Sequence, residues 1–266
     1  MAFISFASLV SESNRLYNFR DVGSTVPLIQ GSRLYRCAFP TSPDALTQAA
    51  IYSKSIVDLR TSVEKSRLPG ALGLTIYNRS VIPPKLKVAL FLLTNASWTQ
   101  KWYLLYDWMT TFSLSRAFRS ALNRQGLFGT NKLLLRGAQN EICEALNTVL
   151  FELESNQSVL ITCTAGKDRT GLIISLILGC VGVPQCDIVN DYVQSAEQIQ
   201  SEAPEFYSYL SVRLANEGLD ATEWIKSPSH VMQDTLGYLD TEYGGLLSYL
   251  DLIGFGKDKQ LRLTYP

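Results

Sequence analysis

A cysteine and an arginine stand six positions apart in the segment from Cys163 to Thr170, which reads Cys-Thr-Ala-Gly-Lys-Asp-Arg-Thr. A thiolate is a strong nucleophile, and a guanidinium can hold two oxygens of a phosphate group in a fork. The segment lies between the β-branched, aliphatic run 159–162 and the apolar run 171–178, so it should connect a strand to a buried helix. These residues predict a loop that binds a phosphate ester and attacks its phosphorus.

The first half of this loop supplies the nucleophile and a cradle for the phosphate. The loop N–H groups and the positive end of the following helix should stabilise the thiolate of Cys163. Gly166 permits the tight backbone that the cradle needs, and Lys167 should add a cation at its rim. The phosphate-binding backbone is expected to include Thr164, Ala165, Gly166 and Lys167.

The second half supplies the acid and the fixed cation. Arg169 should hold the charge on the phosphate oxygens, and Thr170 can donate its hydroxyl to the sulfur of Cys163. Asp168 is the candidate general acid, because burial and negative neighbours favour the protonated form of a carboxyl group. We therefore expect Cys163, Asp168 and Arg169 to be catalytic, and Asp168, Arg169 and Thr170 to bind phosphate as well.

Composition excludes several other classes of protein. The chain has 24 basic and 24 acidic residues, and this balance argues against a general nucleic-acid-binding protein. Its five cysteines are scattered and His230 is its only histidine, so we expect no metal site and no cofactor. Unpaired cysteines favour a reducing, cytoplasmic compartment. Residues 1–10 do not read as a signal peptide, and the apolar run 171–183 is too short to cross a bilayer.

The segment 79–136, here called the basic segment, carries an unusual charge. Its only acidic residue is Asp107, so it has a net charge of +8 and the rest of the chain has −8. It also contains three of the four tryptophans. Its nine basic residues are Arg79, Lys85, Lys87, Lys101, Arg116, Arg119, Arg124, Lys132 and Arg136.

Apolar residues of the basic segment recur at spacings of four and three, which is typical of one stripe of a helix. They are Trp98, Trp102, Leu105, Met109 and Phe112. One interpretation is an amphipathic helix packed on the core. The other is a basic, aromatic lid over an anionic substrate with an apolar part, which the excess of positive charge favours. The same charge would allow transient contact with a membrane surface.

A chain of 266 residues is long enough for one large α/β domain. Short strands are expected over 33–36, 55–59 and 159–162. Helices are expected over 170–178, 187–198 and 204–216, and from 227 to about 242.

The loop resembles a known pattern. Cys-x5-Arg followed by Ser or Thr is the signature of the protein-tyrosine phosphatase superfamily. Its form here, Cys-x-x-Gly-Lys-Asp-Arg-Thr-Gly, resembles the bacterial and fungal tyrosine phosphatase family, and the Asp before the Arg is also similar to myotubularin-type lipid phosphatases. Weaker resemblances to the bacterial and fungal family occur at 18–21, 34–36, 57–60 with Glu64, 190–192 with Ser195, 243–245, 249–250 and 253–254.

The resemblance implies an α/β fold with a central, mostly parallel sheet and helices on both faces. It implies one phosphatase domain over residues 1–266, with the basic segment 79–136 as a helical lid inserted in it. Members use the Cys as nucleophile and the Arg for phosphate, and the loop Asp is the expected acid in this branch. The family usually has a His before the nucleophile, where this chain has Thr162. Supporting ion pairs are expected from Arg20, Asp21, Asp58 and Arg60.

Three functions are compatible with these residues. The first is a phosphatase that forms a phosphocysteine intermediate and acts on phosphotyrosine or phosphoinositide-type substrates. The second is a metabolic phosphatase for a small hydrophobic phosphate or diphosphate, such as an isoprenoid. The third is a pseudophosphatase that binds a phosphate group without turnover, which the intact Cys163, Asp168 and Arg169 disfavour.

Overall fold

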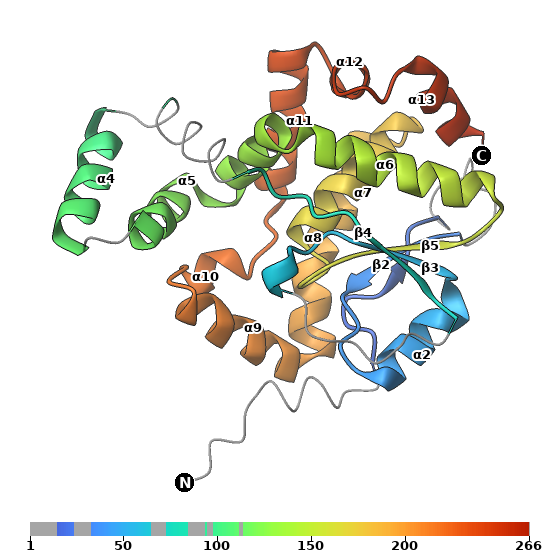
Figure 1. Cartoon of the computed structure of the whole chain (residues 1–266), viewed down its shortest axis with the longest axis horizontal. Helices are drawn as coiled ribbons and strands as arrows, with labels where there is room; N and C mark the ends of the chain where they lie inside the picture. Colours follow the sequence, from blue (N-terminus) through green and yellow to red (C-terminus); the bar gives the residue numbers. More distant parts are fainter. Residues whose placement is uncertain are drawn as a thin grey trace, which may run out of the picture.

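The computed structural model of the chain describes residues 15–23, 33–64, 73–84, 94, 98–111 and 114–265. A central sheet has helices on both faces, and α4 and α5 extend from one side of this body (Figure 1). The expectation about a signal peptide concerns residues 1–10, which lie outside these ranges. Among the helices within them, none is both long and apolar enough to cross a membrane.

The sheet has five strands in the order β1-β2-β5-β3-β4. β1 is antiparallel to β2, and the other neighbours are parallel. This confirms the predicted fold class of a mostly parallel sheet between helices. The strands are β1 (Arg20–Asp21), β2 (Leu34–Ala38), β3 (Ser55–Asp58), β4 (Thr75–Asn78) and β5 (Val159–Cys163).

The central strand β5 is buried along its whole length, as its aliphatic sequence requires of a strand covered on both faces. It ends at Cys163, which lies opposite Ala38 at the end of β2. Thr162 lies opposite Asp58 at the end of β3. The carboxyl ends of three parallel strands therefore meet where the predicted loop begins, and this edge is the usual place for a site in an open α/β sheet.

One face of the sheet is covered by α2 (Pro43–Tyr52), which begins with a cap from Ser42 and a proline in its first turn. The other face packs on α6 (Gln139–Glu154) and α7 (Asp168–Cys180). Behind them lie α8 (Gln185–Glu202), α11 (Ser229–Tyr243), α12 (Leu246–Leu252) and α13 (Lys257–Thr264). The helix after the loop is thus central to the larger core, as its uniformly apolar sequence predicts.

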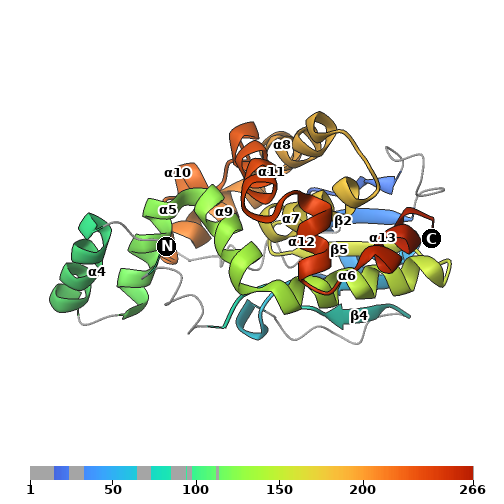
Figure 2. The same cartoon turned by 90° about the horizontal axis from the view of Figure 1, so that it is seen from above.

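The remaining helices lie at the carboxyl edge of the sheet and beyond it. They are η2 (Ser62–Glu64), α4 (Trp98–Thr111), α5 (Leu114–Gly137), α9 (Pro204–Asn216) and α10 (Ala221–Trp224). Gly126 breaks α5 into two pieces with a positive φ of 65°. Figure 2 shows α4 at the end of the molecule opposite α13, beyond α5.

The predicted strands and helices are present, with ends that differ by a few residues. The helix α7 begins two residues earlier than expected, at Asp168, so the loop is shorter and the acid and the arginine lie in the first helical turn. The helices α2 and α6 and the edge strands β1 and β4 were not among the predicted elements.

Candidate active site

A cavity of about 330 Å³ lies at the carboxyl edge of the sheet. The side chain of Cys163 lies in its wall and is only 3% exposed. The walls come from the loop, η2, α5, α8, α9 and α10. Six of the eight predicted loop residues line it: Cys163, Thr164, Ala165, Lys167, Asp168 and Arg169.

Gly166 does not line the cavity but makes the loop's conformation possible. Its φ is +63°, in the left-handed region, and a Cβ atom there would overlap the backbone carbonyl of Cys37 on β2. Only glycine combines that φ with so close an approach to a neighbouring strand. The predicted reason for Gly166, a tight backbone, is therefore confirmed in its geometry.

The carbonyl groups of the loop are held from behind. The side-chain amide of Asn18 donates to the carbonyl oxygens of Ala165 (3.0 Å) and Gly166 (2.9 Å). Arg36 donates to those of Gly166 (2.7 Å) and Lys167 (3.3 Å). In a planar trans peptide the C=O of one residue and the N–H of the next point in opposite directions. Asn18 and Arg36 therefore turn the N–H groups of residues 166–168 away from themselves.

These N–H groups are available to an anion. Within the described part of the chain, the N–H groups of residues 166 and 167, and also those of 164 and 165, donate no hydrogen bond to a protein atom. The helix α7 begins directly after them, and its positive end adds to the field of the loop. A ring of N–H donors beside a thiol is the arrangement that phosphate-ester chemistry requires.

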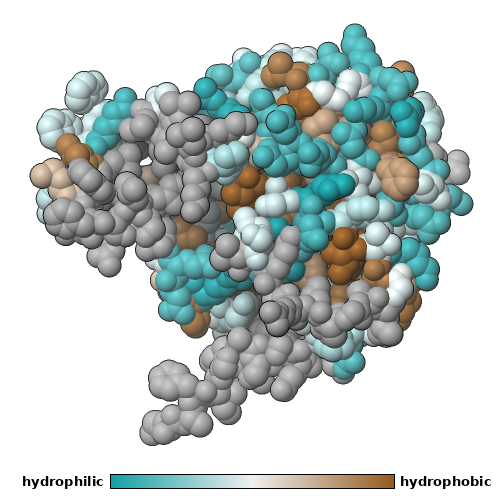
Figure 3. Space-filling model, viewed as in Figure 1, coloured by the Kyte–Doolittle hydropathy of each residue, from teal (hydrophilic) through white to brown (hydrophobic). Residues whose placement is uncertain are grey.

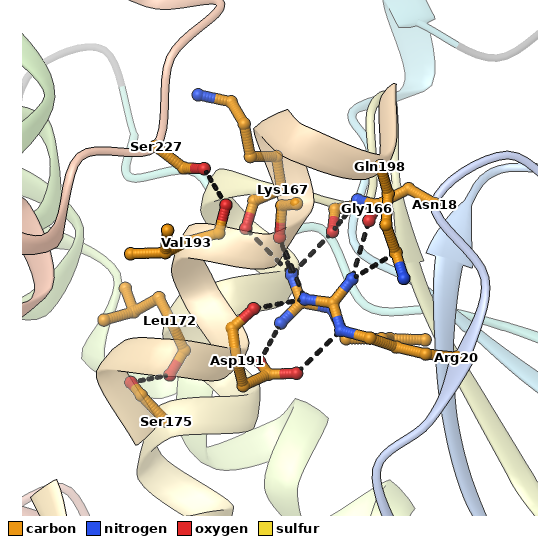
Figure 4. A network of polar contacts seen from close by, with 12 residues as sticks. Asn18, Arg20, Gly166, Lys167, Leu172, Ser175, Asp191, Val193, Gln198 and Ser227 are labelled. Atoms are coloured by element: carbon orange, nitrogen blue, oxygen red, sulfur yellow. Dashed lines mark hydrogen bonds and ion pairs between the residues drawn. The ribbon is translucent and has the colours of Figure 1, made fainter. Parts of the chain in front are cut away.

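A buried ion network anchors Arg36 in turn. Asp191 on α8 accepts from Arg36 and from Nε of Arg20 (2.8 Å). Ser195 accepts from both arginines, at 3.0 and 3.1 Å. Figure 4 shows Asp191 facing Arg20, with Asn18, Gln198 and the carbonyls of Gly166 and Lys167 around them. The network therefore connects β1, β2, α8 and the loop.

Charge balance keeps this network ionised. Burial lowers the pKa of Arg20 to about 10, with a further contribution from nearby Arg36, but leaves it a cation near neutral pH. Burial raises the pKa of Asp191, and the charges of Arg36 and Arg20 outweigh it and lower that pKa. The predicted structural role of Arg20 is confirmed, and so is that of Asp58 and Arg60, which form a buried pair (3.0 Å).

The guanidinium of Arg169 is engaged by a residue that was not predicted to be in the site. Both terminal nitrogens of Arg169 donate to the carboxylate of Glu64, at 2.6 and 2.8 Å. Thr164 donates its hydroxyl to the same carboxylate (2.7 Å), and Thr61 donates through its N–H (2.9 Å) and its hydroxyl (2.8 Å). The carboxylate thus occupies the fork expected to hold phosphate.

The Glu64–Arg169 pair stays charged over a wide range of pH. Burial raises the pKa of Glu64, but the bonds and charge of Arg169 and the bonds of Thr164 and Thr61 outweigh it and hold that pKa well below its usual range. Burial lowers the pKa of Arg169, but Glu64 and the charges of Cys163 and Asp168 raise it overall. Glu64 therefore stays an anion throughout the pH range in which an ordinary carboxyl group titrates.

Lys167 is not the cation at the rim that its position in the loop predicts. Its side chain is buried, and its ammonium donates to the carbonyls of Trp224 (2.9 Å) and Lys226 (2.5 Å) and lies 2.8 Å from Asp168. An ammonium has three donors, and these three acceptors satisfy them. Lys167 ties the loop to the end of α10 instead of presenting its charge to the cavity.

Asp168 remains partly accessible, with 31% of its side chain exposed. The hydroxyl of Tyr192 on α8 reaches its carboxylate at 3.4 Å. Gly171 lets Tyr192 approach this closely, because a Cβ there would lie 2.9 Å from the tyrosine ring. Asp168 is therefore oriented from two sides and faces the cavity.

The two threonines near the nucleophile have buried hydroxyl groups without a hydrogen-bond partner among the described residues. Thr170 is fully buried and does not line the cavity. The predicted bond from Thr170 to the sulfur of Cys163 is therefore wrong for this structure. The side chain of Thr162 points to the opposite face of β5 from Cys163, so its hydroxyl does not bond to the nucleophile.

The cavity has an apolar part to its wall and a second cation. Arg213 on α9 is 28% exposed, bonds to Glu217 (2.9 Å) and lies 3.9 Å from Glu64. No sequence motif marks Arg213 or Glu217, since α9 reads as an ordinary helix. The apolar wall consists of Ile82, Leu134, Ile199, Leu210, Leu214, Leu219, Trp224 and Ile225.

The basic segment contributes to the cavity through α5, whose Thr130 and Leu134 line it. None of the described residues of α4 lines the cavity. The apolar stripe is not packed on the core, since Trp98, Trp102 and Met109 are more than half exposed. Phe112 lies outside the described residues.

We predict that Glu64→Gln strengthens oxyanion binding. The change removes a negative charge beside the anion site and weakens the competitor for Arg169, so the affinity for tungstate should rise about tenfold or more, a difference of about 1.4 kcal/mol. Calorimetric titration measures it. Glu217→Gln is the matched control, since Glu217 lines the same cavity but bonds to Arg213. A fall in affinity for Glu64→Gln would show that the carboxylate orients Arg169 instead of competing for it.

Comparison with known proteins agrees with this geometry. The family model described as "Tyrosine phosphatase family" matches residues 12–265. The chain is 26% identical over 263 residues to the triple specificity protein phosphatase PtpB of Mycobacterium tuberculosis, with 86% of this chain and 91% of PtpB covered. It is 27% identical over 176 residues to a tyrosine-protein phosphatase of Nostoc commune, with 55% and 57% covered. The chain therefore belongs to the tyrosine phosphatase family and is a phosphoric monoester hydrolase.

Proposed function

We propose that this enzyme hydrolyses phosphate monoesters through a phosphocysteine intermediate at Cys163. The observation that carries the proposal is the orientation of the loop. Asn18 and Arg36 bind its carbonyl groups, which leaves its N–H groups to an anion, and Cys163 and Arg169 line the same cavity. The free state of all five cysteines is in keeping with a reducing, cytoplasmic compartment.

The chemistry has two steps. The thiolate of Cys163 attacks phosphorus as the bond from phosphorus to the ester oxygen breaks, and Asp168 gives its proton to the leaving oxygen. Water then attacks the phosphocysteine, the carboxylate of Asp168 takes a proton from that water, and the Cys163 thiolate leaves. The loop N–H groups and Arg169 hold the charge on the phosphate oxygens in both steps.

We propose phosphotyrosine or phosphoinositide-type compounds as the substrates. An apolar wall of Leu210, Leu214 and Trp224 suits the ring of an aryl phosphate. Arg213 offers a second cation for a substrate with another anionic group, such as a phosphorylated inositol. The name of PtpB, a triple specificity phosphatase, favours a site that accepts more than one substrate class.

The apolar wall also supports a second candidate, a small hydrophobic phosphate or diphosphate. Arg213 separates substrates by the number of their anionic groups: a substrate with one phosphate gains little from it, whereas a second anionic group, on a phosphoinositide or a diphosphate, could bind it. Rates on phosphopeptides, phosphoinositides, prenyl monophosphates and prenyl diphosphates identify the class by preference. Their comparison between wild type and Arg213→Gln shows which of them use the second cation.

Cys163→Ser should abolish turnover of an aryl phosphate, by more than about 10³-fold, because a serine hydroxyl is a far weaker nucleophile at neutral pH. The variant should still bind tungstate, since the loop N–H groups and Arg169 remain. Cys186→Ser, at an exposed cysteine on α8, serves as the control and should keep full activity. Wild-type turnover by Cys163→Ser would refute the covalent mechanism. Absence of turnover in the wild type, with tungstate binding intact, would identify a pseudophosphatase.

Asp168→Asn should slow hydrolysis of alkyl phosphates by roughly 10²–10⁴, because their leaving oxygen needs a proton. The loss should shrink for an aryl phosphate whose leaving group is stable as an anion. Steady-state rates on a series of leaving groups measure this dependence, and Asp187→Asn, at an exposed position on α8, is the control. An equal loss on every substrate would mean that Asp168 acts through its contacts with Lys167 and Tyr192 and not as the acid.

A further inference from the structure

The helix α4 exposes an unusual number of large apolar side chains. The exposed fractions are 77% for Trp98, 63% for Trp102, 42% for Leu105, 65% for Tyr106 and 58% for Met109. Single exposed apolar residues are normal on a protein surface, but a contiguous group on one helix indicates an interaction site. Figure 3 shows hydrophobic residues at the surface of this lobe, beside atoms drawn in grey.

These side chains share one side of the helix. At about 100° per residue, Trp98, Trp102, Leu105 and Met109 fall within a sector of roughly 60°, with Tyr106 on its flank. At 1.5 Å of rise per residue, the stripe from Trp98 to Met109 is roughly 17 Å long. Such a narrow apolar stripe can enter a flat apolar layer along its whole length.

The part of the sequence that carries the stripe is strongly positive. The basic segment has nine basic residues and one acidic residue, against a net charge of −8 for the rest of the chain. Lys101 lies on α4 itself, and Arg124 and Arg136 are exposed on α5. A surface that combines tryptophan, tyrosine and a local excess of cations is complementary to the boundary between anionic headgroups and acyl chains.

The position of α4 fits such a contact. α4 packs against α5 and lies at the end of the molecule opposite α13 (Figures 1 and 2). The site is on the same side of the body, since α5, α9 and α10 all line the cavity. A membrane that bound α4 would therefore lie on the same side of the molecule as the cavity.

We propose that α4 docks this protein on an anionic lipid bilayer, with its apolar stripe in the interface and the cations of the basic segment against the headgroups. Docking itself needs no turnover. If the proposed function also holds, docking would bring the cavity close to phosphorylated headgroups in the same leaflet. The substrate class favoured by this arrangement is a phosphoinositide presented in a membrane.

The test is binding of the full chain to vesicles. The inactive Cys163→Ser variant is used, so that the outcome does not depend on catalysis. Cosedimentation should show binding to phosphatidylcholine vesicles that contain phosphatidylserine, and at least tenfold weaker binding to phosphatidylcholine alone. Raising the salt from about 0.1 M to about 1 M, which shortens the screening length from about 10 to 3 Å, should weaken the binding. Brominated lipids should quench the fluorescence of Trp98 and Trp102.

Matched variants locate the contact. Trp98→Ala and Trp102→Ala should each reduce binding by about tenfold, because each removes a large apolar group from the interface. Tyr106→Ala should weaken binding, whereas Tyr265→Ala, at a tyrosine that is 75% exposed beyond the end of α13, should not. The same substitutions are also made in the protein that keeps Cys163. These variants should hydrolyse a soluble aryl phosphate as fast as wild type, which would show that each of them is folded.

Three results would overturn the proposal. The first is no binding to anionic vesicles. The second is equal effects of Tyr106→Ala and Tyr265→Ala. The third combines two observations. The protein does not bind vesicles, and Trp98→Ala or Trp102→Ala alters KM for the soluble aryl phosphate without lipid present; together they would identify α4 as a lid over the cavity. None of these results would refute the proposed function, because it is tested by turnover without lipid.

Discussion

The active site depends on one buried ion network, the contact of Asp191 with Arg20 and Arg36. A fully buried arginine is costly unless its charge is paired, and Asp191 pairs it from α8. Arg36 is then able to hold the loop carbonyls of Gly166 and Lys167. Because the peptide groups are planar, fixing the carbonyls on one side fixes the N–H groups on the other. An anion site is thus created by a network that need not contact the anion.

The parts of the site that are contiguous in the chain could be predicted from the sequence. The loop between β5 and α7 is short and carries its own chemistry, so the roles of Gly166 and of the neighbouring N–H groups follow from residue type. The roles of Glu64 and Arg213 could not be predicted, because they reach the cavity from η2 and α9, about 100 and 50 positions from the loop. The position of Lys167 was predicted wrongly for a related reason, since its acceptors are carbonyls at the end of α10 and just after it. The fold was predictable where strands are uniformly aliphatic, and less so for α2 and α6.

The carboxylate of Glu64 holds the guanidinium of Arg169 with two hydrogen bonds. Under the proposed function, the phosphate of a substrate has to compete with this carboxylate for the guanidinium. Among the described residues, the hydroxyl of Thr162 has no hydrogen-bond partner, so this side chain adds no donor beside Cys163. The site therefore relies on backbone donors more than on side chains, which increases the importance of the network that orients them.

The most direct test of this account is the tungstate affinity of Asp191→Asn. Glu152→Gln is the control, because Glu152 is also a buried carboxylate but bonds to Tyr77 on β4. Both variants should lose stability, and breaking the buried pair at Asp191 should cost about 3–5 kcal/mol. At a temperature where both are folded, Asp191→Asn should bind tungstate at least about tenfold more weakly than wild type, whereas Glu152→Gln should bind it equally well. Unchanged affinity in folded Asp191→Asn would contradict the account, because the loop would then hold its N–H groups in place without the network.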